Sequence, residues 1–181
     1  MQQSDEYINK SRNIMVTLCY DGSGYHGWQV QKNAVSIQEV FQKSLEKIIK
    51  EKVDVKGCSR TDTGVHANMY VANFKTLSKI NPDNLICALT RFLPNDIAVS
   101  NCTGVSGDFH ARYSCVGKEY IYKIWNNKIR TPFLDNRALH YWHSLDADAL
   151  KDAAKSFIGK HDFAAFATLD KRETKNMIRT V

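Results

Sequence analysis

The chain has 181 residues, 43% of them hydrophobic, which is enough for a packed core and excludes a disordered tail or a low-complexity linker. Lysine and arginine outnumber aspartate and glutamate by 25 to 19, and the formal net charge of +6 favours a polyanionic partner such as nucleic acid. No C-x-x-C pair occurs, so reduced thiols are expected rather than a disulfide framework or a zinc site. The five cysteines are Cys19, Cys58, Cys87, Cys102 and Cys115.

Residues 1–13 are polar and of mixed charge, so we expect a flexible N-terminal tail without a signal peptide. No apolar run in the sequence approaches the roughly 20 residues that a membrane helix needs. The sequence therefore predicts a cytoplasmic protein that does not associate with membranes.

The first predicted strand covers residues 14–20, where apolar side chains alternate. Three glycines in the turn-rich stretch 21–29 allow tight or left-handed backbone, so the aromatic residues there can be presented from a loop. Ser36 and Glu39 then show the pattern of a capping box at the start of a helix. The apolar stripe of this helix is predicted to consist of Ile37, Val40, Phe41, Leu45, Ile48 and Ile49.

Three more strands and a second helix complete the first predicted subdomain, residues 14–106. The strands are expected over residues 53–57, 69–76 and 97–102. The helix begins at Asn81 and Pro82, since proline suits the first turn. Its apolar stripe is Leu85, Ile86, Leu89 and Phe92. The order β-α-β-β-α-β is that of the split βαβ arrangement of ferredoxin-like folds.

The segment 107–181 is predicted to be a second, partial subdomain. Its strands are expected over residues 109–115, 119–126, 137–143 and 176–181. A helix follows Leu145 and Asp146 and ends near Gly159. Its inward-facing residues are predicted to be Leu150, Ala153, Ala154, Phe157 and Ile158. The predicted fold class is therefore α+β, with two ferredoxin-like subdomains built on antiparallel sheets, the second of them incomplete.

Arg60, Asp62 and His66 lie within seven residues, in a segment rich in small and turn-forming residues. A carboxylate in such a loop can act as a nucleophile, as a general base or as a group that caps a turn. An Arg-x-Asp triplet alone favours the capping role, since Asp and Gly are ordinary turn residues. His66 alone is likewise better explained as a packing or hydrogen-bonding residue than as an acid–base catalyst.

Aromatic residues close to basic ones point towards RNA. Tyr25, His26 and Trp28 lie in the glycine-rich loop, and Tyr120 and Tyr122 alternate in a basic segment. Exposed aromatic side chains among lysines and arginines can stack on unpaired bases while phosphates are held. Alternation alone would make one tyrosine a core residue and the other a rim residue. Basic residues that could follow an RNA backbone, or simply form a solvated surface, are Arg91, Arg112, Lys118, Lys123, Lys128 and Arg130.

Motifs for metal and nucleotide chemistry are missing from the sequence. The six histidines show no metal-binding spacing, and no P-loop or G-x-S-x-G motif occurs. These absences disfavour a metal-dependent hydrolase or phosphotransferase. We expect neither a cofactor nor a metal ion.

Several segments, in order along the chain, resemble the tRNA pseudouridine synthase A family. They are residues 20–31, 36–39, 59–67, 109–114, 118–122 and 159–163, and the segment from Ser59 to Ala67 is similar to the signature of the family. The resemblance extends from Ile14 onward. It implies isomerisation of uridine to pseudouridine in the anticodon stem-loop of tRNA (positions 38–40), without cofactor or metal, by a homodimer.

By motif position, the resemblance implies that Asp62 is the nucleophile towards the sugar C1′ or the uracil ring. Arg60 would take part in extruding the target base, and Tyr120 would stack on it. Extrusion from a paired stem costs a few kcal/mol, and stacking can return about 1–3 kcal/mol. Further residues expected to contact substrate RNA are Tyr25, His26, Trp28, Gln29, His66, Arg112 and Lys118.

Members of the family continue past the position where this chain stops, so we expect a C-terminally truncated chain, for which dimerisation is left open. Two alternatives to an active enzyme remain at this stage: a non-catalytic RNA-binding module and an inactive fragment of the enzyme. The combination of Arg60, Asp62 and Tyr120 favours the enzyme, because a pure binder would not need to keep these residues together.

Overall fold

The computed structural model describes residues 11–166 and 176–181. It divides into two compact units, one up to Tyr120 and one from Ile121 onward. Each unit contains both helix and strand, which confirms the α+β class. In the part of the chain that is described, no helix is long and apolar enough to cross a membrane. The subdomain boundary expected at 106/107 stays a prediction.

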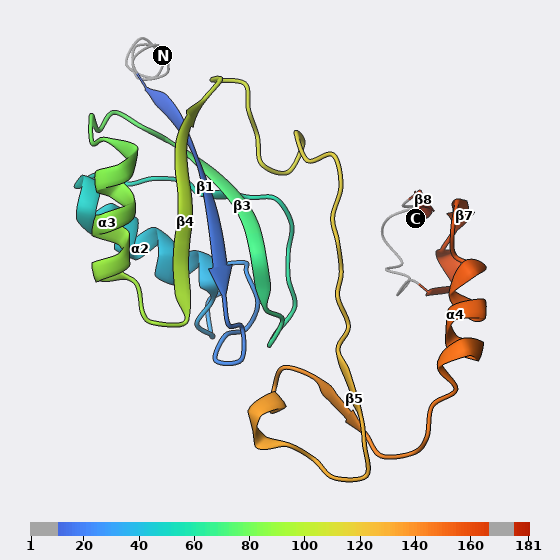
Figure 1. Cartoon of the computed structure of the whole chain (residues 1–181). Helices are drawn as coiled ribbons and strands as arrows, with labels where there is room; N and C mark the ends of the chain where they lie inside the picture. Colours follow the sequence, from blue (N-terminus) through green and yellow to red (C-terminus); the bar gives the residue numbers. More distant parts are fainter. Residues whose placement is uncertain (1–10, 167–175) are drawn as a thin grey trace. The chain divides into compact units, whose positions relative to one another are not determined.

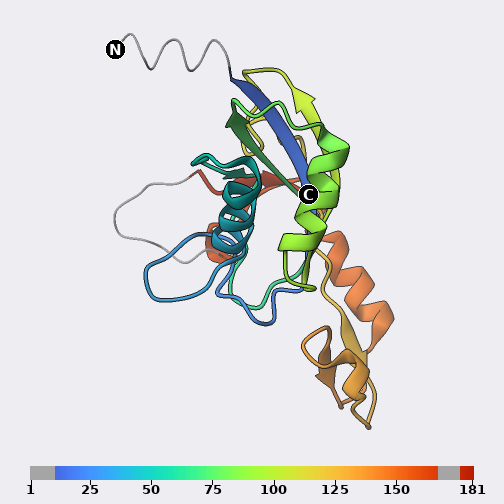
Figure 2. The ribbon, with the colours of Figure 1, turned by 90° about the vertical axis from the view of Figure 1, so that its left-hand side faces the viewer.

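The first unit has one four-stranded antiparallel sheet, in the order β2-β3-β1-β4. Its elements are β1 (Arg12–Tyr20), α2 (Ile37–Ile49), β2 (Lys56–Gly57), β3 (Ala67–Thr76), α3 (Pro82–Phe92) and β4 (Ile97–Val105). Both helices cover the same face of the sheet, as Figures 1 and 2 show from two sides. The predicted order β-α-β-β-α-β is confirmed for this unit.

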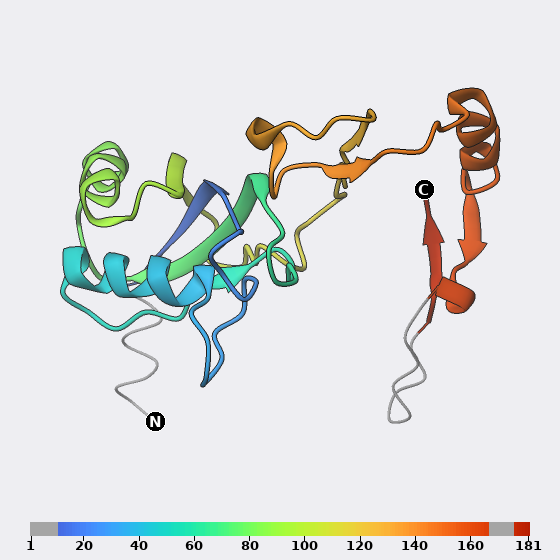
Figure 3. The same ribbon diagram turned by 90° about the horizontal axis from the view of Figure 1, so that it is seen from below.

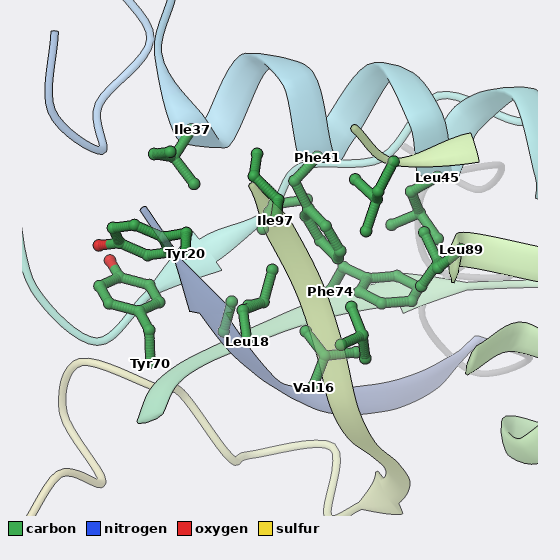
Figure 4. Packing of buried hydrophobic residues seen from close by; sticks show 14 of the residues in the cluster. Val16, Leu18, Tyr20, Ile37, Phe41, Leu45, Tyr70, Phe74, Leu89 and Ile97 are labelled. Atoms are coloured by element: carbon green, nitrogen blue, oxygen red, sulfur yellow. The ribbon is translucent and has the colours of Figure 1, made fainter. Parts of the chain in front are cut away.

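The register of the strands explains where the core lies. On β1, Ile14, Val16 and Leu18 alternate with less buried residues and point to the helices, as period-two alternation predicts. Ile14 pairs with Phe74 of β3, and Val16 with Cys102 of β4, so three strands contribute to one apolar layer. Figure 4 shows this layer closed by side chains that include Phe41, Leu45 and Leu89.

Both predicted helix starts are confirmed. The Ser36 hydroxyl accepts a hydrogen bond from the Glu39 amide at 3.4 Å, and Asn81 caps the start of α3 in the same way. The Glu39 side chain is instead paired with Lys43, one turn further along, at 2.5 Å. The prediction that Phe92 faces the core is wrong, because its side chain is 53% exposed at the last turn of α3.

The strand predicted over residues 53–57 is shorter, because side chains of α2 satisfy its first backbone groups. The Val53 amide donates to Glu46 Oε1 at 3.3 Å, and Gln38 Nε2 donates to the Val55 carbonyl at 2.9 Å. Of the predicted strand, only the two residues of β2 pair with β3. The predicted 1–13 tail also needs correction, since β1 already begins at Arg12, and residues 1–10 lie outside the described part of the chain.

The strand predicted over residues 109–115 is wrong. This segment forms consecutive turns, in which the amides of Tyr113 and Ser114 both donate to the His110 carbonyl, at 3.0 and 2.8 Å. The His110 amide donates in turn to the Ser114 hydroxyl at 3.2 Å. Local bonds of this kind leave few backbone groups for a strand ladder.

The second unit consists of short elements. They are β5 (Ile124–Asn126), η1 (Pro132–Leu134), β6 (Leu139–Tyr141), α4 (Ala147–Lys155), β7 (Lys160–Asp162), η2 (Ala164–Phe166) and β8 (Ile178–Thr180). The predicted strands over 137–143 and 176–181 are confirmed only in their central residues, and the one over 119–126 only at its end, residues 124–126. β7 was not predicted. Asp146 caps α4 as expected. The residues predicted to face inward along this helix are all exposed.

β5 and β6 pair in parallel, which contradicts the predicted antiparallel sheet. The connection of about a dozen residues between them includes η1 and is long enough for the crossover that parallel pairing requires. β7 and β8 are antiparallel. Figure 3 shows the same elements from below. A second ferredoxin-like subdomain stays a prediction.

Candidate active site

The predicted catalytic residues lie on the loop that joins β2 to β3, residues 58–66, which we call the catalytic loop after this prediction. Alternate residues of this loop are anchored to the body of the first unit. The Tyr70 hydroxyl donates to the Ser59 carbonyl, the Trp28 amide donates to the Thr61 carbonyl at 3.1 Å, and the Tyr20 hydroxyl lies 3.1 Å from Thr61 Oγ1. Ser59 and Thr61 are therefore the anchored positions of the loop.

A cluster of three aromatic side chains supports the anchored residues. Trp28 stacks on Tyr70 with ring centroids 4.1 Å apart, and Tyr20 lies 5.7 Å from Tyr70. All three are buried. Tyr20 and Tyr70 lie side by side (Figure 4). Sequence reasoning missed this support, although Tyr20 continues the apolar face of the first predicted strand.

Burial also changes the acidity of these phenols. It raises the pKa of Tyr20 to about 12, although the hydrogen bond with Thr61 partly opposes this rise. The pKa of Tyr70 is raised even further above its usual value, chiefly by burial. Both tyrosines therefore remain neutral donors at physiological pH.

We expect the free energy of unfolding to fall as the pH rises from about 10 towards 12. In the unfolded chain the two phenols ionise near pH 10, whereas in the folded chain their pKa values are higher. The unfolded state therefore loses protons first, so high pH favours it. Urea titrations between pH 8 and 11 give the free energy of unfolding at each pH. This free energy should fall less steeply with pH for Tyr20→Phe than for the parent chain. An exposed-site control, Tyr122→Phe, should keep the parent slope; equal slopes for all three would contradict the assignment.

Close backbone approach holds the glycine-rich loop against the catalytic loop. Gly27 has a φ of +77°, and a Cβ placed on it would lie 2.3 Å from the Thr61 carbonyl oxygen. The amide of Gly64 donates to the Tyr25 carbonyl at 3.2 Å, which adds a second link between the two loops. A residue with a side chain at position 27 would thus push the catalytic loop away.

Arg60 and Asp62, the residues next to the anchored positions, are exposed. The carbonyl of Asp62 accepts from the Val65 amide at 3.2 Å, so a turn follows the carboxylate directly. No ion pair between Arg60 and Asp62 occurs within the described ranges. The loop therefore presents a guanidinium and a carboxylate to solvent from a backbone that is tied down on both sides of Thr61.

His66 connects the catalytic loop to the start of the glycine-rich loop. Its Nδ1 lies 3.0 Å from Asp21 Oδ1 and 3.1 Å from the amide nitrogen of Gly22. A protonated Nδ1 would donate to Asp21, whereas an unprotonated Nδ1 would accept from Gly22, so only one of the two bonds forms at a time. In this position His66 links the two loops.

The prediction that Tyr25 and Trp28 are exposed stacking residues is wrong. Their side chains are 7% and 1% exposed, and the Tyr25 hydroxyl donates to Asp96 Oδ1 at 2.7 Å. His26 and Gln29, in contrast, are exposed on the same loop. Gln29 Nε2 donates to Gln38 Oε1 at 3.0 Å. The two buried aromatic residues therefore support the loop, and only its exposed members can reach a ligand.

The remaining predicted residues lie on the segment that follows β4. Arg112, Lys118 and Tyr120 are exposed, with the Tyr120 side chain at 72%. The Arg112 guanidinium lies over the ring of Tyr113, 5.9 Å from its centroid. Among the residues the structure describes, no hydrogen bond joins Tyr120 to Asp62. The geometry thus brings Arg60, Asp62 and His66 onto one loop and leaves Tyr120 separate from it.

Comparison with known proteins identifies the family. A family profile described as "tRNA pseudouridine synthase" matches residues 18–114. The chain is also 48% identical over 170 residues to "tRNA pseudouridine synthase A" of Thermoanaerobacter sp. (strain X514), which covers 94% of this chain and 69% of that protein. The chain belongs to the tRNA pseudouridine synthase family.

Two further members of the family show the same relation. The protein named "tRNA pseudouridine synthase A" of Ruminiclostridium cellulolyticum is 48% identical over 155 residues, covering 86% of this chain and 63% of its own length. The protein of the same name from Clostridium acetobutylicum is 43% identical over 170 residues, covering 94% of this chain and 69% of its own. The chain thus spans about two thirds of these relatives. The family profile includes the whole catalytic loop and ends at Ser114, before Tyr120.

The described part of the chain offers no metal site for this family member. Within residues 11–166 and 176–181, no three or more His, Cys, Asp or Glu side chains gather as a metal ion would require. The loop itself presents two charged side chains to solvent, the carboxylate of Asp62 and the guanidinium of Arg60.

Proposed function

We propose that this chain converts uridine to pseudouridine in the anticodon stem-loop of tRNA (positions 38–40), with Asp62 as the nucleophile. Family membership supports the coarser part of the assignment, a pseudouridine synthase that acts on tRNA and is an isomerase. The observation that carries the finer part is the catalytic loop: Ser59 and Thr61 are anchored, whereas Arg60 and Asp62 face solvent.

The chemistry requires no added group. The Asp62 carboxylate attacks the sugar C1′ or the uracil ring, and the bond between N1 and C1′ breaks. The uracil rotates, a bond forms between C5 and C1′, the C5 hydrogen leaves as a proton and N1 gains one. Release of Asp62 then restores the carboxylate. Substrate and product have the same atoms, so the reaction is an isomerisation without external oxidant or reductant.

Access to C1′ within a paired stem requires that the nucleotide be extruded, which costs a few kcal/mol. Arg60 is two residues from Asp62 and is exposed on the same anchored loop. Its planar, charged side chain can occupy the space left by the base and contact the neighbouring phosphates. We assign to Arg60 this role in extrusion.

The proposed substrate contacts extend over other exposed residues of the first unit. His26, Gln29, Arg112 and Lys118 have exposed side chains, and the chain carries a net charge of +6. Basic groups that neutralise phosphates release counterions, so binding of tRNA should weaken as salt increases. Dimerisation is a proposal that rests on the resemblance, and a cytoplasmic location is a proposal that rests on the sequence composition.

Tyr120 is proposed to stack on the extruded uracil. We expect Tyr120→Ala to lose about 1–3 kcal/mol of interaction with the base, whereas Tyr120→Phe keeps most of it. Single-turnover rates with tRNA measure this difference. Tyr122→Ala is a matched control, since Tyr122 is also exposed, at 88%, and lies two residues away. If Tyr122→Ala reduced the rate more than Tyr120→Ala, the stacking role would belong to Tyr122.

Tritium release from tRNA labelled at C5 of uridine tests the proposed function, because formation of pseudouridine expels the C5 hydrogen. The relative from Thermoanaerobacter sp. (strain X514) serves as a comparison on the same tRNA. Release by this chain supports the assignment of the enzyme. Binding of tRNA without release would favour the alternative, an RNA-binding module or an inactive fragment.

A further inference from the structure

Two buried asparagines form a hydrogen-bonded pair between β1 and β3. Asn13 and Asn73 are 3% and 4% exposed, and Asn73 Nδ2 donates to Asn13 Oδ1 at 2.9 Å. Each lies between residues that point to the helices, so their side chains are on the opposite face of the sheet. A buried amide without partners would be strongly unfavourable at such positions.

The remaining polar atoms of the pair all bind one segment, residues 106–111. Asn13 Nδ2 donates to the carbonyls of Ser106 and Phe109, both at 2.9 Å. Asn73 Oδ1 accepts from the Ala111 amide at 2.8 Å, and Asn73 Nδ2 also approaches the Phe109 carbonyl at 3.4 Å. Both side-chain nitrogens and both side-chain oxygens of the pair thus have partners, and three backbone positions of the segment are held.

These bonds are specific for a backbone path. An apolar pair on adjacent strands would suit a buried position of the sheet equally well. The amides instead provide donors and an acceptor at the places where the turns after β4 expose two carbonyls and one amide. Asn13 and Asn73 therefore determine the path of this segment over the sheet.

The segment ends where the proposed RNA contacts begin. Ala111 is 2% exposed, and the next two residues, Arg112 and Tyr113, are both exposed. The ring of Tyr113 lies 4.4 Å from that of His110, which helps to fix the turn. Tyr120 follows nine residues after Ala111, a stretch that can span about 30 Å when extended. A shift at Ala111 would be passed on to every residue of this stretch.

We propose that Asn13 and Asn73 are positioning residues, which fix the point where the chain that carries Arg112, Lys118 and Tyr120 leaves the sheet. Neither asparagine contacts substrate; they act through Arg112 first, because it adjoins the held amide of Ala111. The inference rests on the proposed function, since that function assigns RNA contacts to these three residues.

Asn73→Asp tests whether the pair holds the segment, because the two side chains have nearly the same volume. The carboxylate would face the Phe109 carbonyl and Asn13 Oδ1 without a hydrogen to donate, so the segment should be released at neutral pH. Amide hydrogen exchange in residues 107–114 should accelerate about tenfold or more. The affinity for tRNA should fall about tenfold, as expected when a charge-assisted contact is misplaced. Asn101→Asp, at an exposed position of β4, is the matched control and should change neither quantity.

Acidification should reverse the effect of Asn73→Asp. Burial next to two acceptor oxygens would raise the pKa of the new carboxyl group above its unfolded value of about 4. Its protonated form can donate one hydrogen bond, so the bond is present at low pH and is lost as the pH rises through the raised pKa. The ratio of variant to parent affinity should therefore recover between pH 7.5 and 5.5. Leu89→Val in the core is the control for a general loss of stability. Its affinity ratio should show no such recovery at low pH.

A double-mutant cycle shows whether the pair acts through Arg112. If it does, Asn73→Asp should weaken tRNA binding much less in an Arg112→Ala background than in the parent chain. Equal effects in both backgrounds, or unchanged exchange in residues 107–114, would overturn the inference. If the parent chain bound no tRNA at all, the proposed function would fail, whereas the exchange measurement would still decide whether the asparagine pair holds the segment.

Discussion

Asp62→Asn is expected to abolish tritium release from C5-labelled tRNA, with a loss of at least about 10³-fold. The amide keeps the shape of the side chain but is not a nucleophile. Because Asp62 is exposed and its carbonyl, not its carboxylate, makes the bond with the Val65 amide, the fold of the loop should be unchanged. Binding of tRNA, measured by filter binding, should stay within about threefold of the parent value.

Asp83→Asn is the matched control for this variant. Asp83 is exposed in the first turn of α3, and its removal should lower helix stability only slightly and leave the release rate unchanged. Residual release by Asp62→Asn near the parent rate would mean that another group is the nucleophile. A parallel loss of tRNA binding would indicate that Asp62 holds the substrate and does not attack it.

Gly27→Ala is expected to have the largest effect on stability, a decrease of about 2–5 kcal/mol in the free energy of unfolding. Two costs add at this position: the positive φ of 77°, and the contact of the new Cβ with the Thr61 carbonyl oxygen at 2.3 Å. Relief of that contact requires the catalytic loop to move. Activity should therefore fall further than the loss of folded protein explains, when both are measured on the same sample.

Two other glycines separate the two costs. Gly64 has a φ of +78° with open space around its Cβ position, so Gly64→Ala should lose only the conformational part, about 1 kcal/mol or slightly more. Gly24 has neither a positive φ nor a neighbour within 4 Å, and Gly24→Ala should be neutral or slightly stabilising. In urea denaturation, the loss in free energy of unfolding should be largest for Gly27→Ala, smaller for Gly64→Ala and smallest for Gly24→Ala. If Gly64→Ala matched Gly27→Ala, the contact with Thr61 would contribute nothing.

Local patterns in the sequence were sufficient for β1, α2 and α3 of the first unit. Alternation in β1, the stripe and cap of α2, and the Asn81-Pro82 start of α3 each depend on residues within a few positions of one another. The same is true of the motif that contains Arg60 and Asp62, which its small and turn-forming residues placed on a loop. Periods of 2 and 3.6 residues are properties of the backbone, so they can be recognised before any tertiary contact is known.

Tertiary structure alone decided which side chains of the site are exposed and where the chain runs after β4. Trp28 lies in a glycine-rich loop and yet is buried, because Tyr70, more than forty residues away, stacks on it. The segment predicted as a strand over 109–115 turns instead, and Asn13 and Asn73 hold it from 96 and 38 residues away. Bonds between such distant residues leave no periodic trace in the sequence, and their partners become known only when the strands are paired.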